Sequence, residues 1–227
     1  MPQQLVELRN YTLVPGATEA FVSHFDEHFL ASQAELGMDV VGQFTVPGDD
    51  ARFVWIRRFL QPATRGDALG AFYSGPVWKE LGPRANELML DHTDVHLLRP
   101  DPSAPDFAPG GPGQRWTSPE VPGSTVVAAL YDLDDDAPGL PAETAAAMTS
   151  LVAAAGPDVV ELGRLVSARV PNDFPLLPVH DTNVALWLLA DHGGGTVARS
   201  LTSEPVPALD LPHRSLHLTP TRHSFLR

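Results

Sequence analysis

Two short runs of the chain place acids, an arginine, a tyrosine and histidines at every second position. One run carries Glu7, Arg9 and Tyr11, and the other carries His92, Asp94 and His96. Because alternate residues of a β-strand lie on the same face, each run would present its polar side chains together. An arginine can stabilise a developing oxyanion, a histidine can act as acid or base, and a tyrosine can donate a hydrogen bond. The pattern predicts an acid–base site, with a hydrogen-bonded network that only stabilises the sheet as the alternative.

Two further histidines lie one helical turn apart in the string HFDEH at 24–28. The string has the H-x-x-E-H form of the inverted zinc peptidases, so His24 and His28 could reach one metal ion. No second zinc-ligand motif follows, and we predict no metal site. His28 is expected to share the apolar stripe of Phe21 and Phe25 and to face the sheet, with His24 at the margin. Both are candidates to line a pocket, and a hydrogen-bonded core histidine is the alternative.

Aromatic residues complete the candidate site. Trp55, Tyr73 and Trp78 are expected either to wall an apolar ligand site or simply to pack in the core. The predicted catalytic side chains are Arg9, Tyr11, His28 and His96. The predicted substrate-binding side chains are Glu7, His24, Trp55, Tyr73, Trp78 and Asp94. The glycine run at 193–195 lacks the lysine and spacing of a phosphate-binding loop.

The elements that must position these residues follow a ferredoxin-like order. The β-forming residues and the turn signals predict strand, helix, strand, strand, helix, strand over the first hundred residues. The expected ranges are 5–13, 19–36, 40–46, 52–60, 65–90 and 92–99, with the last helix broken at Gly75 and Pro76. The first and fourth strands are expected on opposite sides of the sheet.

The second half of the chain repeats the first. The run 125–133 overlays 5–13 and places Tyr131 on Tyr11, and a Trp-containing strand around Trp187 overlays the one around Trp55. The overlay also places His217 on His96. At the positions of Glu7 and Arg9 the second copy has Val127 and Ala129, so the polar set is found in one copy. Only a short helical remnant is expected after the glycine run.

The domain boundaries follow from this repeat. We predict an α+β fold with a first ferredoxin-like domain at 1–99, a Pro/Gly-rich linker at 100–123 and a second, degenerate domain at 124–227. Helices cover one face of each sheet, so packing the two bare faces together closes an α/β barrel, within one chain or between the chains of a homodimer. The interior of this barrel is expected to receive Glu7, Arg9, Tyr11, Asp94 and His96.

Composition excludes several classes of function. The 227 residues carry a formal net charge of −13, which argues against binding nucleic acid or an anionic membrane surface. The absence of cysteine removes disulfides, thiolate metal sites and cysteine nucleophiles. No targeting signal or run of membrane-spanning length is found, so a cytoplasmic protein is expected.

The motifs resemble those of one family. The run ELRNYTLVPG at 7–16, then VWIRRF at 54–59, Arg65, FY at 72–73 and PVW at 76–78 are similar to NIPSNAP-family sequences, and NDFPLLPV at 172–179 resembles the matching segment of tandem members. The resemblance implies a ferredoxin-like fold in the dimeric α/β-barrel superfamily. Related barrels include cofactor-free monooxygenases, polyketide cyclases, isomerases, haem enzymes and proteins without known catalysis, so fold alone does not fix the reaction.

Three hypotheses about function follow. The first is a biosynthetic enzyme that isomerises, cyclises or oxygenates an apolar cyclic or polyketide-like substrate in a barrel cavity, without a cofactor, by acid–base chemistry. The second is a non-catalytic ligand-binding or protein-interaction scaffold with a packed interior. The third is haem binding, which requires an axial histidine in the cavity.

Overall fold

The structure is a computed structural model, which describes residues 4–104, 106–107, 123–203 and 213–227. The first half contains β1 (Leu5–Leu13), α1 (Thr18–Glu35), β2 (Met38–Val46), β3 (Asp49–Phe59), a 3-10 turn (Pro62–Thr64), α2 (Arg65–Ser74), α3 (Pro76–Leu88) and β4 (Met89–Pro100). The second half contains β5 (Thr125–Asp132), α4 (Ala142–Ala155), β6 (Val159–Ser167), β7 (Val184–Asp191), α5 (Thr196–Ser203) and β8 (His213–Pro220). The predicted break at Gly75 and Pro76 separates α2 from α3, and α5 is the predicted short remnant.

The strands form one closed barrel in the order β1-β3-β2-β8-β5-β7-β6-β4. Each half contributes four consecutive strands, and the halves join where β2 pairs with β8 and β4 pairs with β6. The barrel therefore closes within a single chain, and the predicted α+β fold of two ferredoxin-like units is confirmed. β1 pairs directly with β4, so the prediction that these strands lie on opposite sides of the sheet is wrong.

The pairing of the strands shows which residues of the two halves occupy equivalent positions. Arg9 lies opposite Trp55 and Ala129 lies opposite Trp187, so this part of the overlay holds. In the last strands, however, Leu8 lies opposite His96 whereas Ala128 lies opposite Leu216. Equating His217 with His96 is thus wrong by one residue, and one residue reverses the face of a strand.

The barrel interior is filled by apolar side chains from both halves. The buried interior cluster includes Val6, Leu8, Phe44, Ile56, Leu98, Val126, Leu130, Leu165, Leu186, Leu188 and Leu218. Since Val6 and Leu8 point inward, Glu7, Arg9 and Tyr11 point outward, beneath the helices. Their predicted place inside the barrel is therefore wrong. A charge in the dry interior would lack the hydrogen-bonding partners that the helix-covered face supplies.

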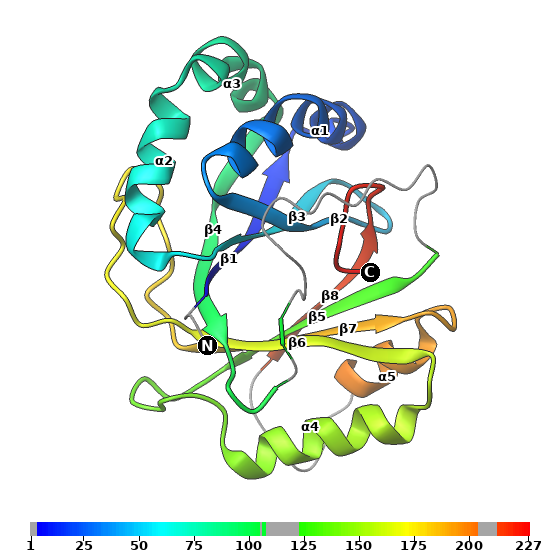
Figure 1. Ribbon diagram of the computed structural model, residues 1–227. Helices are drawn as coiled ribbons and strands as arrows, with labels where there is room; N and C mark the ends of the chain where they lie inside the picture. The colour runs from blue at the N-terminus through cyan, green and yellow to red at the C-terminus, as the bar shows by residue number, and fades with distance from the viewer. Residues whose placement is uncertain (1–3, 105, 108–122, 204–212) are drawn as a thin grey trace.

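The helices cover the barrel on opposite sides. Helices α1, α2 and α3 lie over the sheet of the first half, and α4 and α5 lie over that of the second (Figure 1). A chain of aromatic rings packs between the first set and its sheet, including Phe21, Phe25 and Phe29 of α1. Within the described part of the chain, no helix is both long and apolar enough to span a membrane. Residues 105 and 108–122 of the predicted linker lie outside the described residues.

Candidate functional site

A buried ion cluster lies on the helix-covered face of the first sheet. Glu7 accepts hydrogen bonds from Arg9 Nη1 at 2.9 Å and from Arg57 Nε at 3.1 Å. Its second carboxylate oxygen accepts one from Arg65 Nε at 2.8 Å. All four side chains are fully buried. Burial alone raises the pKa of Glu7, but the three guanidinium groups overcome this effect and lower the pKa to about 2. The carboxylate is therefore ionised, and the cluster as a whole carries excess positive charge.

A loop from the second half closes over this cluster. Asp173 pairs with Arg65 Nη1 and also accepts a hydrogen bond from the backbone N–H of Gly66 at 2.9 Å. Phe174 stacks on Tyr73, with ring centroids 5.9 Å apart. Figure 1 shows this yellow loop, between β6 and β7, lying against α2. The site of the first half is thus completed by the second half.

The guanidinium of Arg9 polarises a tyrosine. Arg9 Nε donates to the hydroxyl oxygen of Tyr11 at 2.7 Å, so the phenol proton of Tyr11 is available to another acceptor. Burial raises the pKa of Tyr11, although Arg9 acts in the opposite direction. The phenol therefore stays protonated, and it is a polarised hydrogen-bond donor.

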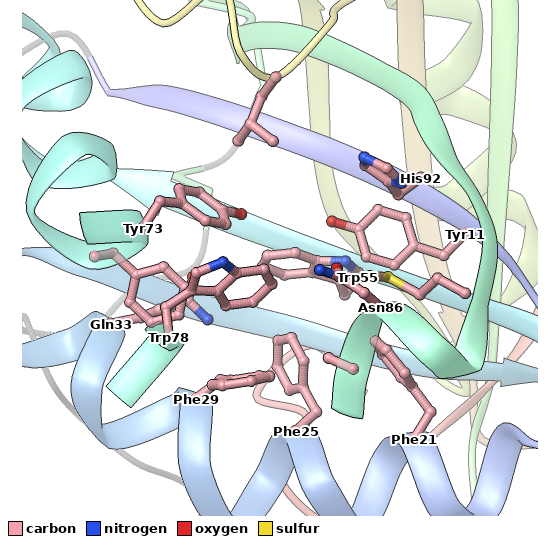
Figure 2. Close-up of a pocket in the computed structure, with 14 residues that line it drawn as sticks. Tyr11, Phe21, Phe25, Phe29, Gln33, Trp55, Tyr73, Trp78, Asn86 and His92 are labelled. Atoms are coloured by element: carbon pink, nitrogen blue, oxygen red, sulfur yellow. The ribbon is translucent and has the colours of Figure 1, made fainter. Parts of the chain in front are cut away.

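An aromatic cavity opens beside Tyr11. Its volume is about 60 Å³. The lining residues are Tyr11, Phe21, Phe25, Phe29, Gln33, Trp55, Phe72, Tyr73, Trp78, Ala85, Asn86, Met89, His92 and Leu177. The hydroxyl groups of Tyr11 and Tyr73 point toward one another across it (Figure 2). The cavity is mostly apolar with a few convergent polar groups, as small-molecule sites are.

Several donors at this cavity lack an acceptor. The indole Nε1 of Trp55 and the amide Nε2 of Gln33 are buried and have no hydrogen-bond partner among the described residues. The same holds for Nη2 of Arg9, which lies behind Tyr11. Buried donors are almost always satisfied in folded proteins, so these need oxygen atoms from water or from a bound molecule. The cavity is therefore suited to a largely apolar ligand that carries an oxygen acceptor.

His92 reaches the cavity because β4 is irregular. Asn10 lies opposite Asp94 and Thr12 lies opposite Asp91, so three steps on β4 match two on β1. Such a bulge reverses the alternation of side chains. His92 therefore contacts the ring of Tyr11, with centroids 6.3 Å apart, on the helix-covered face. The expectation that His92 shares a face with Asp94 and His96 is wrong for this reason.

Asp94 and His96 lie on the barrel side, as predicted, but apart from the aromatic cavity. Asp94 accepts from Asn10 Nδ2 at 2.9 Å and contacts His180 Nε2 at 2.9 Å. The Nε2 atom of His96 lies 2.9 Å from Arg214 Nη2. Burial, followed by His180 and Arg214, lowers the pKa of His96 to about 4, so the imidazole is neutral. These residues form a second polar cluster, at the junction of the two halves.

The predicted pair on α1 lies outside the cavity. His24 Nε2 lies 2.9 Å from the backbone oxygen of Leu81, and the rings of His24 and His28 are 4.8 Å apart. The buried stripe of α1 continues from Phe29 to Gln33, so His28 lies at its side and is half-buried. The expectation that His28 faces the sheet is therefore wrong.

The structure thus brings together Tyr11, Trp55, Tyr73 and Trp78 of the predicted site, with Glu7 and Arg9 directly behind them. It separates them from His24 and His28 on α1 and from Asp94 and His96 in the barrel. The sequence did not single out Gln33, Asn86 or Leu177, and it placed His92 on the wrong face of its strand. Helical spacing from Phe29 would have pointed to Gln33, whereas a bulge and a loop contact leave no local signal in a sequence.

Comparisons with known proteins agree with this architecture. Residues 6–105 match the NIPSNAP family model. A candidate monooxygenase from Lactobacillus acidophilus NCFM superimposes with a TM-score of 0.55 at 10% identity, over 99% of this chain and 99% of its own. One from Fusobacterium nucleatum gives 0.56 at 8% identity, over 96% of this chain and 93% of its own. These likenesses show the fold.

A solved NIPSNAP-like structure is similar over about half of the chain. An uncharacterized NIPSNAP-like domain protein from Burkholderia xenovorans is 22% identical, covers 47% of this chain and 92% of its own, and has a TM-score of 0.42. No curated protein matches the sequence.

Proposed function

The first half of this chain is a NIPSNAP domain, and on that premise we propose that the protein is a small-molecule enzyme whose site is the aromatic cavity beneath α1, α2 and α3. The substrate is an apolar cyclic compound that carries an enolisable carbonyl or a phenol. The site lies on the outer face of the first sheet, in place of the barrel interior that the sequence suggested. The protein would act on a small-molecule ligand in the cytoplasm, without a cofactor.

The observation that carries this proposal is the polarised donor at the cavity wall. Tyr11 accepts from Arg9, so its own proton can stabilise an oxyanion, and the excess positive charge of the cluster behind it favours that anion. Trp55 Nε1 and Gln33 Nε2 supply further buried donors. A carbonyl or enolate oxygen would satisfy them.

The chemistry is a proton transfer. A base removes the proton from the carbon next to the carbonyl, and the electron pair of that C–H bond forms the C=C bond of the enolate. The π pair of the C=O bond moves to the oxygen, and Tyr11 stabilises the resulting enolate. His92 is the base in this proposal, because it is a half-buried imidazole that lines the same cavity. The enolate is the shared starting point for isomerisation, cyclisation or attack on O₂. Tyr73, Trp55 and Trp78 would hold the ring.

Two measurements test the site. A nitrophenol, whose ionised form is coloured, serves as an enolate analogue, and its apparent pKa should fall on binding to the wild-type protein. Tyr11→Phe should weaken this binding by about tenfold or more, because a donor to a charged oxygen is lost. Tyr131→Phe is the matched control, since Tyr131 occupies the equivalent position in the second half. Equal binding by Tyr11→Phe and the wild type would refute the proposed site.

Hydrogen–deuterium exchange separates catalysis from binding. The protein should accelerate exchange of the α-hydrogens of a small cyclic ketone in D₂O, followed by NMR, and both Tyr11→Phe and His92→Gln should reduce the rate by about a hundredfold. The packed apolar interior of the barrel favours one alternative, a non-catalytic ligand-binding scaffold. That alternative predicts nitrophenol binding at Tyr11 without accelerated exchange.

A further inference from the structure

The second polar cluster has the composition of a metal site. Within the parts of the chain that the structure describes, Asp94, His96 and His180 form the one group of potential ligands whose donor atoms all lie within 4.8 Å of one another. Asp94 Oδ1 lies between the two rings, 2.9 Å from His180 Nε2 and 3.6 Å from His96 Nε2. Donors bound to one zinc-sized ion at about 2.0–2.2 Å stand about 3.0–3.5 Å apart. The observed spacing is close to that range.

The three ligands are held in place by their surroundings. The backbone N–H of His180 donates to the carbonyl oxygen of Val95 at 2.8 Å, which fixes the loop residue beside both β4 ligands. Asn10 Nδ2 donates to the other carboxylate oxygen of Asp94 at 2.9 Å, so Oδ1 stays turned toward the histidines. Partners of this kind orient metal ligands and raise affinity. The loop that carries His180 is also fixed at Asp173 by the pair with Arg65.

His96 is buried beside a small cavity. Only 4% of its surface is exposed, and its Nε2 atom is the one that faces Asp94. The cavity beside it has a volume of about 90 Å³. The wall includes Leu8, Asn10, Leu130, Leu186 and Arg214. A metal ion at this place would have room for water or a small ligand on its open side.

We propose that Asp94, His96 and His180 bind one divalent first-row transition metal ion. Two imidazoles and one carboxylate are the ligand set used by zinc sites and by non-haem iron sites with open positions. The site joins the two halves, because β4 supplies two ligands and the loop before β7 supplies the third. It is separate from the aromatic cavity and from the histidine pair on α1, which was the only candidate for metal binding that the sequence offered and at which no metal site was predicted.

Arg214 makes the proposal more specific. Its Nη2 atom lies 2.9 Å from Nε2 of His96, where it competes with a metal ion for the same lone pair. Arg214 is an exposed residue, so its side chain can turn away when the ion binds. It would then stand beside the open coordination positions and favour an anionic ligand on the metal.

Metal binding to the full chain tests this inference. The protein is stripped with a chelator and titrated with Zn²⁺ by calorimetry and with Co²⁺ by visible absorption, where ligand-field bands report imidazole coordination. We expect one equivalent per chain, a rise in the unfolding temperature with metal, and a loss of at least about a hundredfold in affinity in His180→Ala. Asp94→Asn should lose affinity as well while keeping a side chain of the same shape. Arg214→Gln should bind several-fold more tightly.

His28→Ala is the matched control, because it breaks the histidine pair on α1. Binding that disappears in His28→Ala and persists in His180→Ala would overturn the proposal. So would a wild-type protein that takes up no stoichiometric metal while folded, as judged by circular dichroism. In either case nitrophenol binding at Tyr11 would be unaffected, so the aromatic site is judged separately.

Discussion

Glu7 and the three buried arginines around it determine the electrostatics of the aromatic cavity. A lone arginine in the core would be costly, and Glu7 offsets that cost for three of them at once. Because one glutamate faces three arginines, the cluster keeps a net positive charge beside the cavity, and a positive charge is what stabilises an oxyanion. The equivalent strand of the second half has Val127 and Ala129 at these positions, and both are buried in an apolar cluster. The same strand positions therefore carry a charged cluster in one half and apolar side chains in the other.

Replacing Glu7 with glutamine should remove the charge that holds this cluster together. We expect Glu7→Gln to lower the free energy of unfolding at pH 7 by about 3–5 kcal/mol, since the arginines remain buried without a counter-ion. Urea unfolding measures the change. The exposed Glu143 on α4 offers the control Glu143→Gln, which should have almost no effect.

The same residue sets a pH dependence. The pKa of Glu7 in the folded protein is about 2 and lies below its ordinary value of 4.5, so its stabilisation is complete above pH 4.5 and is lost as the pH falls toward 2. At about 1.4 kcal/mol per pH unit this amounts to roughly 3 kcal/mol. Unfolding free energies of the wild type should therefore fall more steeply over this window than those of Glu7→Gln. Equal slopes would show that Glu7 is not paired as described.

Elements were easier to predict from sequence than the faces they present. Strand and helix order, the break before Pro76 and the internal repeat all leave local signals. The sequence leaves no local signal of which face of β1 turns inward, because both faces are buried. The polar residues of β1 find partners only under the helices. The bulge near His92 and the one-residue shift at His217 depend on pairing between distant strands. Loop residues such as Leu177 reach the site through long-range contacts, which the periodicity of the sequence does not indicate.

Docking of the β6–β7 loop onto α2 can be tested with two glycines of the same helix. A β-carbon on Gly66 would lie 2.9 Å from the backbone oxygen of Asp173, whereas one on Gly70 would meet nothing closer than 4.0 Å. Alanine favours a helix by about 1 kcal/mol over glycine. Gly70→Ala should therefore raise the unfolding temperature by about 2–4 °C, and Gly66→Ala should lower it.

Hydrogen exchange measures the local effect of the two variants Gly66→Ala and Gly70→Ala. In Gly66→Ala the segment 172–179 should lose protection, because the clash separates Asp173 from Arg65 and Gly66. In Gly70→Ala the protection should be unchanged. Faster exchange in both variants would mean that the loop is not held by this contact.

At the scale of the whole molecule, two repeated units share one interior. The apolar cluster inside the barrel takes side chains from both halves, so the inner face of each sheet is buried only against the other half. Function follows the same division. The first half supplies the charged cluster and most of the aromatic cavity, and the second supplies the loop that closes it.

This shared interior predicts that the chain unfolds as one cooperative unit. Leu186 on β7 is 1% exposed and packs in the common cluster, so Leu186→Ala should cost about 2–5 kcal/mol through the cavity it leaves. Leu176→Ala, at a side chain that is 81% exposed, should cost almost nothing. Although Leu186 belongs to the second half, its loss should lower the unfolding midpoint of the first half equally. Fluorescence of Trp55 and Trp78 is recorded in a background that carries both Trp116→Phe and Trp187→Phe, so that it reports the first half, and circular dichroism reports the whole chain. Coincident midpoints that shift together are expected; a first-half signal that stays in place while the rest of the chain unfolds earlier would show that the two units are independent.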